Sequence, residues 1–191
     1  MKKIILFAAM AFVTVAGYAQ PKFAHVNFSE LVQLMPEADE ARATMAASQK
    51  EASETFQSMY EEYQSKMQQY QQKSATWTPA IKESKEKELV DIQQRLEEFN
   101  QTIQQELQQQ QQQLMAPIYQ KAQETVNKLA KDGNYIYVID LTSVLYLDPA
   151  QSIDLTPAAR KALAIPDSRT LESLQAELQA QAEAEAAAAQ K

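Results

Sequence analysis

Two long runs of apolar residues at intervals of three and four constrain the fold of this chain more than any other feature. Such intervals place side chains on one face of an α-helix. Only two glycines, Gly17 and Gly133, occur in 191 residues, so almost nothing interrupts regular structure. The sequence predicts two long helices with narrow apolar seams. The first seam comprises Ala52, Phe56, Met59, Tyr63, Met67 and Tyr70, and the second Leu89, Ile92, Leu96, Phe99, Ile103, Leu107 and Leu114.

Six consecutive glutamines, Gln108 to Gln113, lie inside the second run. Such a tract could be disordered, prone to aggregation, or part of a helix. Leu107 and Leu114 flank it and continue the seam, and glutamine is a good helix former. We therefore expect the second helix to run through the glutamines, which would be an aggregation risk only in an unfolded chain.

The segment from Ala75 to Pro79 breaks the periodicity, and Thr78 before Pro79 suits a helix start. If the chain folds back here, facing residues have numbers that sum to about 155, and seam positions then meet seam positions along both helices. The sequence predicts an antiparallel helical hairpin over residues 37–133, an arm on the order of 50 Å long. The expected pairs are Tyr63 with Ile92, Met59 with Leu96, Phe56 with Phe99, Ala52 with Ile103, and Ala41 with Leu114.

Residues 1–20 have the pattern of a secretory signal peptide. Lys2 and Lys3 precede an apolar stretch, and Gly17 and Ala19 suit a cleavage site after Ala19 or Gln20. The stretch is shorter than the roughly 20 apolar residues of a membrane span. The chain has no cysteine, which excludes disulfides and a lipoprotein-type anchor. We expect a periplasmic protein that is soluble after cleavage.

Charge narrows the classes of partner. The whole chain has a formal charge of −7, and loss of Lys2 and Lys3 would leave 16 basic against 25 acidic residues, or −9. Nucleic acid is therefore not an expected partner.

Shorter elements flank the hairpin. We expect a strand over residues 23–28, a helix capped by Ser29, and a kink or restart at Pro36. Pro117 should kink the second long helix, and Gly133 should end it in a left-handed conformation. Strands are predicted over residues 135–140 and 144–147, joined by residues 141–143, with a short strand at 153–155 and a helix over 156–163.

The opening "FAHVNFSELV" and the later "YIYVIDLTSVLYLDPAQSIDLTPAARKAL" resemble the Skp/OmpH family of periplasmic chaperones over residues 22–165. The resemblance implies an α+β, mostly helical fold, in which a long antiparallel coiled-coil hairpin projects as a tentacle from a small β body. The body would comprise residues 21–36 and 134–165. It also implies a jellyfish-like homotrimer that holds unfolded outer-membrane proteins between its arms, without ATP or any other cofactor. Familiar enterobacterial members are basic, whereas this chain is acidic, so membrane or lipopolysaccharide contact is doubtful here.

Two sets of residues are candidates for these roles. The arm residues could simply form the seam, but some could line the client cavity, where methionine suits varied apolar partners. Trp77, at the tip, could contact clients or pack against Ile81. The client-binding candidates are Phe56, Met59, Tyr63, Met67, Tyr70 and Trp77, and the candidates for the trimer interface are Val26, Phe28, Ile136, Val138, Val144 and Tyr146.

The sequence does not predict an enzyme. His25 is the single histidine, and without cysteine or a second histidine it is expected to be an ordinary strand side chain rather than a catalytic or metal-binding group. A glycine-rich phosphate loop cannot be built from two isolated glycines. Acidic pairs such as Glu61-Glu62 fit solvated helix faces.

Residues 171–191 are almost entirely Ala, Gln, Glu and Leu. We expect residues 166–191 to form a mobile tail, which could be helical in part but has too little bulk to pack. Two functional classes remain open: a holdase chaperone that encloses unfolded chains, and a structural or adaptor coiled coil of the envelope. Holding is not expected to require the tail.

Overall fold

The computed structural model describes residues 22–189, and long helices dominate it. The predicted signal peptide lies outside these residues. The elements are β1 (Lys22–Val26), α2 (Phe28–Leu34), α3 (Pro36–Lys73), η1 (Ser74–Thr76), α4 (Pro79–Asp132), β2 (Tyr135–Asp140), η2 (Leu141–Ser143), β3 (Ser152–Asp154), α5 (Thr156–Ala162) and α6 (Leu171–Ala189).

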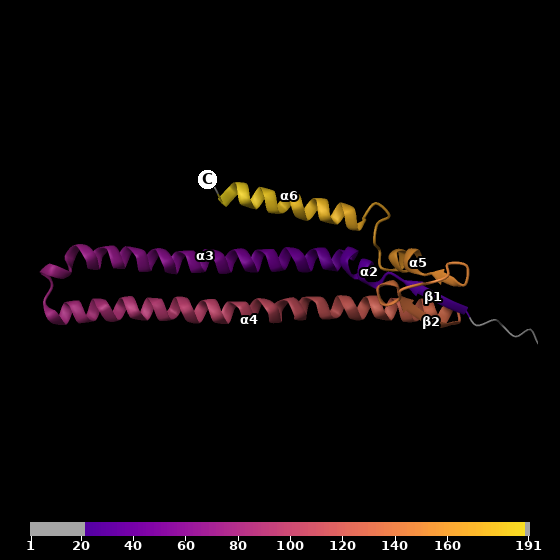
Figure 1. The fold of residues 1–191 in the computed structure, drawn as a ribbon, viewed down its shortest axis with the longest axis horizontal. Helices are drawn as coiled ribbons and strands as arrows, with labels where there is room; N and C mark the ends of the chain where they lie inside the picture. The colour runs from indigo at the N-terminus through magenta and orange to yellow at the C-terminus, as the bar shows by residue number, and fades with distance from the viewer. Residues whose placement is uncertain (1–21, 190–191) are drawn as a thin grey trace, which may run out of the picture.

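The predicted helical hairpin is confirmed: α3 and α4 run side by side in opposite directions and form one long arm (Figure 1). Their 38 and 54 residues correspond to about 57 and 81 Å at 1.5 Å per residue. Gln108 to Gln113 lie within α4, as expected. The helix also continues through Pro117 without interruption.

Proline fixes the start of both arm helices. Pro36 begins α3 directly after Met35, whose extended backbone separates it from α2. Pro79 begins α4 after Thr78, which is also extended. The first helical position suits proline because its missing N–H would have no intrahelical partner there. The predicted restart at Pro36 and turn before Pro79 are therefore confirmed.

Hydrogen bonds between the two helices fix their register. Gln93 Nε2 donates to the Tyr63 hydroxyl at 2.7 Å, and Gln110 Nε2 donates to Ser48 Oγ at 3.0 Å. Lys66 pairs with Glu88 in the distal arm. The residue numbers of these pairs sum to between 154 and 158, close to the predicted 155, and the sum rises toward the base of the arm.

The body contains a small parallel sheet of order β2-β1-β3. Ala24 of β1 pairs with Val138 of β2 on one side and with Ile153 of β3 on the other. The whole arm is thus the connection between two neighbouring parallel strands, β1 and β2. The central strand is the most buried, because Ala24, His25 and Val26 all lie inside.

The predicted strand over residues 23–28 is too long at its C-terminal end, and Ser29 is not the cap. Phe28 begins α2, and Asn27 holds the N-cap position. Asn27 Oδ1 accepts a hydrogen bond from the Glu30 backbone at 3.1 Å, and its Nδ2 donates to the Glu30 carboxylate at 3.1 Å. Asparagine is an effective cap because its short side chain reaches these first free N–H groups.

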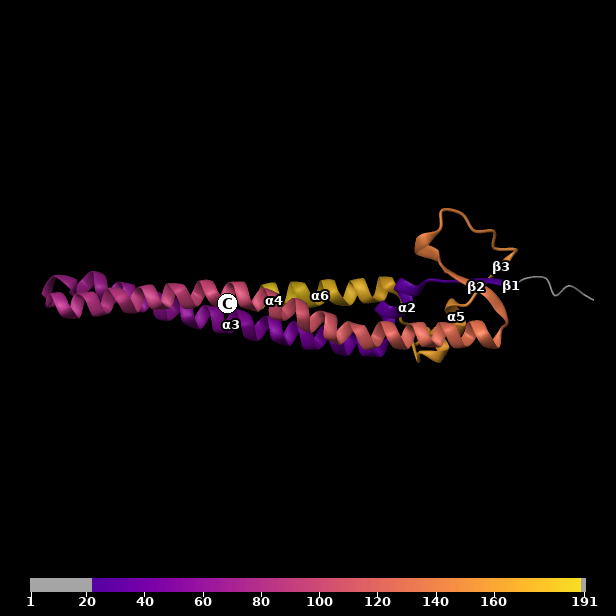
Figure 2. The same ribbon diagram turned by 90° about the horizontal axis from the view of Figure 1, so that it is seen from below.

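The predicted strand over residues 144–147 is wrong. Residues 141–143 form η2, capped by Asp140, and the chain then leaves the sheet. The segment between β2 and β3 projects away from the helices (Figure 2). Within residues 22–189 this segment pairs with no strand, although the outer edges of β2 and β3 are unpaired there. The expected short strand near 153 is present as β3, at Ser152–Asp154.

The expected left-handed glycine at the end of α4 is also wrong. Gly133 has φ of −84°, and Asn134 adopts the left-handed conformation with φ of 54°, which asparagine tolerates better than most residues. Gly133 instead leaves room for a neighbouring ring. A Cβ there would lie 2.1 Å from Cε2 of Tyr135, so any side chain would displace that ring.

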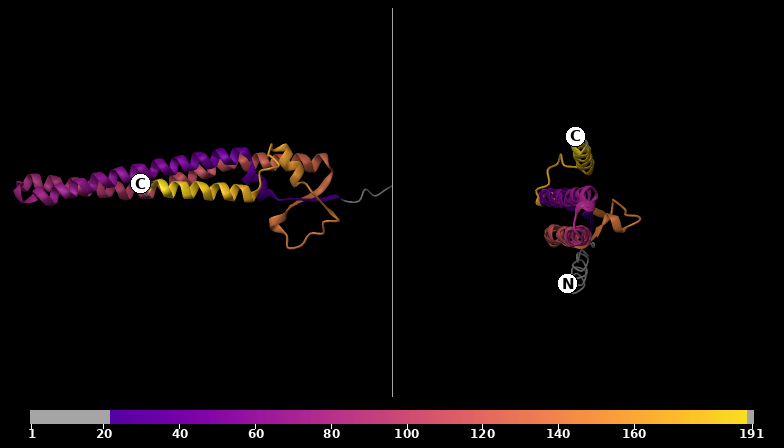
Figure 3. Two further views of the ribbon diagram at one scale, coloured as in Figure 1. Left: turned by 90° about the horizontal axis from the view of Figure 1, so that it is seen from above. Right: turned by 90° about the vertical axis from the view of Figure 1, so that its left-hand side faces the viewer.

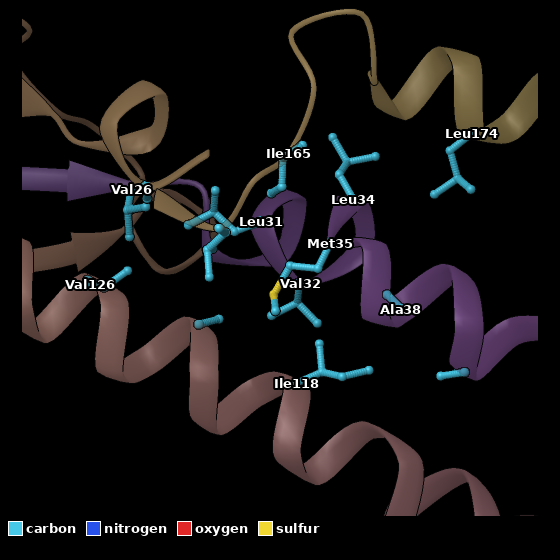
Figure 4. Close-up of a cluster of buried hydrophobic side chains, with 14 residues drawn as sticks. Val26, Leu31, Val32, Leu34, Met35, Ala38, Ile118, Val126, Ile165 and Leu174 are labelled. Atoms are coloured by element: carbon cyan, nitrogen blue, oxygen red, sulfur yellow. The ribbon is translucent and has the colours of Figure 1, made fainter. Parts of the chain in front are cut away.

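The main hydrophobic core lies at the base of the arm, around α2 (Figure 4). Ile118 and Val126 of α4 point toward α2 from one side, and Leu174 of α6 approaches from the other. Leu31, Leu34 and Met35 are fully enclosed. The short helix α2 is therefore the element on which the arm, the body and α6 all converge.

The predicted tail is largely helical and packs at its start. Residues 171–189 form α6, and Leu174 is buried at 4% exposure, so the expectation that this segment lacks the bulk to pack is wrong for its first turns. Thr170 and Ser173 form a reciprocal capping box, since each side chain accepts from the other's backbone N–H at 2.9–3.1 Å. The helix runs beside the arm and ends well short of its tip (Figure 3).

Candidate functional site

The arm is a thin structure with few enclosed side chains. In α3 only Ala38 and Ala41, at the base, are buried. In α4 the distal half contributes Leu89 and Ile92 to the buried set. The client-binding candidates Met59, Tyr63, Met67, Tyr70 and Trp77 are half-buried, and Phe56 is exposed. They therefore belong to the seam and still present part of their surface to solvent.

An exposed aromatic pair lies midway along α3. Phe56 and Tyr60 stack with ring centroids 6.4 Å apart and an interplanar angle of 6°, and they are 38% and 42% exposed. The sequence analysis missed Tyr60 because it lies off the seam. Its position four residues after Phe56 was the available signal, since residues at this spacing are neighbours on a helix surface.

Small hollows on both sides of the hairpin open near Ala52. One, of about 290 Å³, is lined by Ala52, Ile103 and Leu107 together with polar residues. The other, of about 220 Å³, also includes Phe56 and Phe99. The hollows exist because a methyl group on α3 faces large side chains on α4. The hollows make the surface of the arm uneven, but neither is an enclosed cavity.

At the tip, Trp77 packs against Tyr70 with an edge-on geometry and ring centroids 5.8 Å apart. The Tyr70 hydroxyl donates a hydrogen bond to Glu86, and this carboxylate raises the pKa of Tyr70. Ile81 is exposed. Trp77 was expected either to contact clients or to pack against Ile81. In the structure its ring packs against Tyr70 and remains half-accessible.

Ion pairs reinforce the distal arm. The Glu88 carboxylate accepts hydrogen bonds from Lys66 of α3 and, at 2.8 Å, from Lys85 one turn earlier on α4. These two ammonium groups lower the pKa of Glu88 to about 2. Near the base, Lys121 and Glu37 form a similar bridge, which lowers the pKa of Glu37. Ion pairs therefore join α3 to α4 along an arm whose apolar seam is thin.

The body exposes several large apolar side chains on and beside its sheet. They are Ile136, Tyr137, Leu145, Tyr146 and Ile153, all of them exposed, and we call this set of residues the body surface. Ile136 and Tyr146 were among the predicted interface residues, whereas Tyr137, Leu145 and Ile153 were not. Tyr137 and Leu145 were missed because the predicted strands assigned alternate side chains to the interface, namely Ile136, Val138, Val144 and Tyr146.

The remaining interface candidates are used within the subunit. Val26 is buried in the core, and Val138 packs against it. Phe28 is half-buried, lies against the same core and stacks obliquely on Tyr119, with ring centroids 6.2 Å apart. Val144 is half-buried. Their bulk supports the fold around α2, so they are less accessible to a neighbouring subunit than the body surface.

The side chain of His25 connects β1 to β3. Its Nδ1 lies 2.8 Å from Ser152 Oγ on β3, and its Nε2 lies 3.9 Å from Asp154, too far for a hydrogen bond. The ring is buried, and Asp154 instead accepts a bond of 2.8 Å from the Thr156 backbone. The three side chains therefore join β1 to β3 and the start of α5, and lack the continuous hydrogen-bond relay of a hydrolase.

Residues 22–189 contain no group of three or more His, Asp or Glu side chains arranged to hold a metal ion. Among the helices of this same range, none has the length and apolar content needed to cross a membrane.

Comparisons with known proteins agree with this architecture. Residues 22–163 match the family described as "Outer membrane protein (OmpH-like)". A crystal structure of a proposed outer membrane chaperone (OmpH-like) from Caulobacter crescentus superposes with a TM-score of 0.68 at 16% identity, covering 77% of this chain and 86% of that one. At this identity the match shows a shared fold. A comparison with curated proteins finds no match.

Proposed function

The chain belongs to the family of OmpH-like outer membrane proteins, and from this premise we propose that it is a periplasmic holdase chaperone. It would bind unfolded outer-membrane proteins between helical arms and prevent their aggregation before membrane insertion, without ATP. The observation that carries the proposal is the distribution of apolar side chains on the arm, which are numerous, scattered and only partly buried.

A holdase needs many weak contacts rather than one deep pocket, because its clients share no fixed sequence. The arm offers such contacts. Exposed side chains such as Phe56, Tyr60 and Val90 lie on its surface, and half-buried methionines such as Met59 and Met67 accompany them. Methionine adapts its shape to different apolar partners. Ordering a client costs about 1 kcal/mol or more per residue, so weak contacts allow a client to remain unfolded and to leave.

We further propose that three copies assemble through the body surface. The body surface consists of large apolar side chains that are exposed in the single subunit, and exposed apolar surface commonly marks interfaces between proteins. A three-stranded sheet of five, six and three residues is also small for an independent unit. Three arms on one body would raise the effective concentration of binding sites around one client.

The net charge of the chain favours some classes of partner over others. An acidic chain, at −7 overall, favours basic segments of a client and disfavours nucleic acid and anionic lipid headgroups. The proposal therefore includes no lipopolysaccharide binding. The predicted signal peptide at residues 1–20 supports export to the periplasm.

The test is aggregation of an unfolded outer-membrane β-barrel protein after dilution from denaturant. A holdase should suppress light scattering at about one trimer per client, without ATP. The second candidate function, a structural or adaptor coiled coil, would leave scattering unchanged and instead bind one folded partner. The body surface favours the chaperone, since a simple spacer has no use for a β body.

A further inference from the structure

The C-terminal helix α6 lies beyond the family match, which ends at residue 163, and it creates a groove that the arm alone does not have. The groove has a volume of about 450 Å³ and lies between α6 and the basal parts of α3 and α4. Its apolar walls include Met45 of α3, Leu114 and Met115 of α4, and Leu174 and Leu178 of α6. We call it the α6 groove.

The root of α6 is built firmly. Arg160 donates from Nη2 to the carbonyl oxygens of Pro166 and Arg169, and its Nη1 pairs with Glu30 at 2.7 Å. Arg169 in turn bridges Asp39 of α3, at 2.7 Å, and Glu177 of α6. These carboxylates raise the pKa of Arg169. The position of α6 beside α3 is therefore set by specific contacts.

The distal part of α6 leaves the groove open. After Leu178 the helix contains only Ala, Gln and Glu, so it has no large side chain to fill the space, and it diverges from α3 toward its C-terminal end (Figure 1). A helix that served only to cover the arm would need apolar bulk here. The volume is in the range of small-ligand sites, large enough for a few side chains of a segment and too small for a folded domain.

The polar side chains that line the α6 groove limit the kind of ligand that it could bind. Four charged residues line the groove: Asp39, Arg42, Arg169 and Glu177. They are paired with one another, so they do not require a charged ligand. Gln49, Gln111 and Gln181 contribute uncharged amides to the lining, which can both donate to and accept from a peptide backbone. The outer part of α6 adds Glu183 and Glu185, and the helix has no Lys or Arg.

We propose that the α6 groove is a client-binding site that takes a short apolar segment of an unfolded polypeptide with a basic residue beside it. The apolar walls would accept alternate side chains of the extended segment, the glutamines would bond its backbone, and the acidic helix would attract the flanking cation. This inference rests on the proposed function and assigns one place where clients are held.

The experiment uses the absence of native cysteine. Gln181→Cys, which lines the groove, is labelled with a polarity-sensitive dye, and Ala180→Cys, exposed and outside the lining, is labelled as the control. The probe is a ten-residue peptide of alternating phenylalanine and serine between two lysines. The dye at position 181 should show a saturable blue shift and the dye at 180 should not, and replacing both lysines by glutamates should weaken binding.

A second pair of variants tests whether the groove itself is responsible. Ala46→Phe fills the groove, whereas Ala47→Phe adds the same side chain at an exposed neighbouring position outside it. In the Gln181→Cys background, the first should weaken peptide affinity by about tenfold, the order expected for losing the burial of one large apolar side chain, and the second should leave it unchanged.

The outcomes separate the two proposals. A silent dye at position 181, or equal effects of Ala46→Phe and Ala47→Phe, would overturn the groove assignment even if the wild-type protein suppresses client aggregation. A concentration-dependent shift without peptide would also overturn it, because the occupant would then be a second copy of this chain. A saturable shift without any suppression of aggregation would support the groove and refute the holdase.

Discussion

Gln93 on α4 donates a hydrogen bond of 2.7 Å to the hydroxyl of Tyr63 on α3, next to Ile92, which is 1% exposed. Leu89 and Ile92 are the buried residues of α4 between Pro79 and Leu114, and α3 has none beyond Ala41. The distal arm is therefore held together by the two buried residues Leu89 and Ile92, which we call the lock. The hydrogen bond from Gln93 to Tyr63 fixes the register of the two helices beside it.

The first prediction concerns this lock. Ile92→Ala should destabilise the distal arm by about 2–4 kcal/mol, because it removes a fully enclosed side chain. Amide hydrogen exchange of residues 60–96 should accelerate while that of β2 stays unchanged. Val90→Ala is the matched control: Val90 is 58% exposed on the same helix, and its replacement should cost no more than about 0.5 kcal/mol. Similar exchange in both variants would contradict the lock.

The second prediction concerns acid. The pKa of Glu88 is lowered from 4.5 to about 2 by Lys66 and Lys85. Its pairing therefore stabilises the arm fully above about pH 4.5, and this contribution is lost as pH falls toward 2. Protection of residues 60–96 in hydrogen exchange should decline over that window. Glu88→Gln should lower protection at pH 6 and flatten the decline, and an unchanged slope would assign the acid sensitivity to other groups.

The third prediction tests the body surface. Ile136 and Tyr146 are 58% and 83% exposed, so Ile136→Asp with Tyr146→Asp should not disturb the subunit core but should prevent assembly. Sedimentation should show monomers with nearly wild-type helix content. Val90→Asp places the same charge on an exposed arm residue and should leave the trimer intact. Val138 is a poorer choice, because it packs against the core of its own subunit and an aspartate there would damage the fold directly.

Sequence periodicity predicted the arm well because its fold depends on local repetition. Leu107 and Leu114 continue the seam through six glutamines, and the register near 155 follows from matching two seams. Competition between close alternatives was harder to predict. Asn27 and Ser29 can both cap a helix, and Gly133 and Asn134 can both adopt a left-handed conformation. In each pair the residue type alone does not decide the outcome: Asn27 caps α2, and Asn134 adopts the left-handed conformation.

Long-range burial explains the larger misses. A strand over residues 144–147 is reasonable from composition, but whether it forms depends on the path of the chain, which leaves the sheet after Asp140 although the outer edges of β2 and β3 are unpaired among the described residues. The segment after Pro166 looked too poor in apolar residues to pack. Leu174 nevertheless completes the core around α2, and one such residue is invisible to a count of composition. Tyr60 was missed because the seam pattern favours residues that face the other helix.

The fourth prediction concerns the exposed aromatic pair. Phe56→Ser with Tyr60→Ser should weaken client binding several-fold, because two stacked apolar rings leave the arm surface. Stability should change little, since both side chains are exposed in the free protein. The matched control is Gln57→Ser with Glu61→Ser, a polar pair at the same spacing on the same helix. Equal affinity in the two double variants, measured by client titration, would exclude the pair as a contact site.

The last prediction concerns arm length. Deleting residues 67–73 from α3 together with 82–88 from α4 removes two matched turns next to the tip, since facing residues have numbers that sum to about 155, and shortens the arm by about 10 Å. The deletion keeps the buried Leu89 and Ile92. Seven residues preserve the helical phase closely enough for the remaining seams to meet again.

This double deletion should abolish most suppression of aggregation, because a shorter arm encloses less of the client and presents fewer apolar contacts. Helix content should fall only in proportion to the residues removed, and the trimer should persist, since the body surface is untouched. Deleting residues 67–73 alone is the control for misfolding: it moves one seam by seven residues against the other and should lower thermal stability. If the matched deletion kept full holding activity, clients would not be held between the arms.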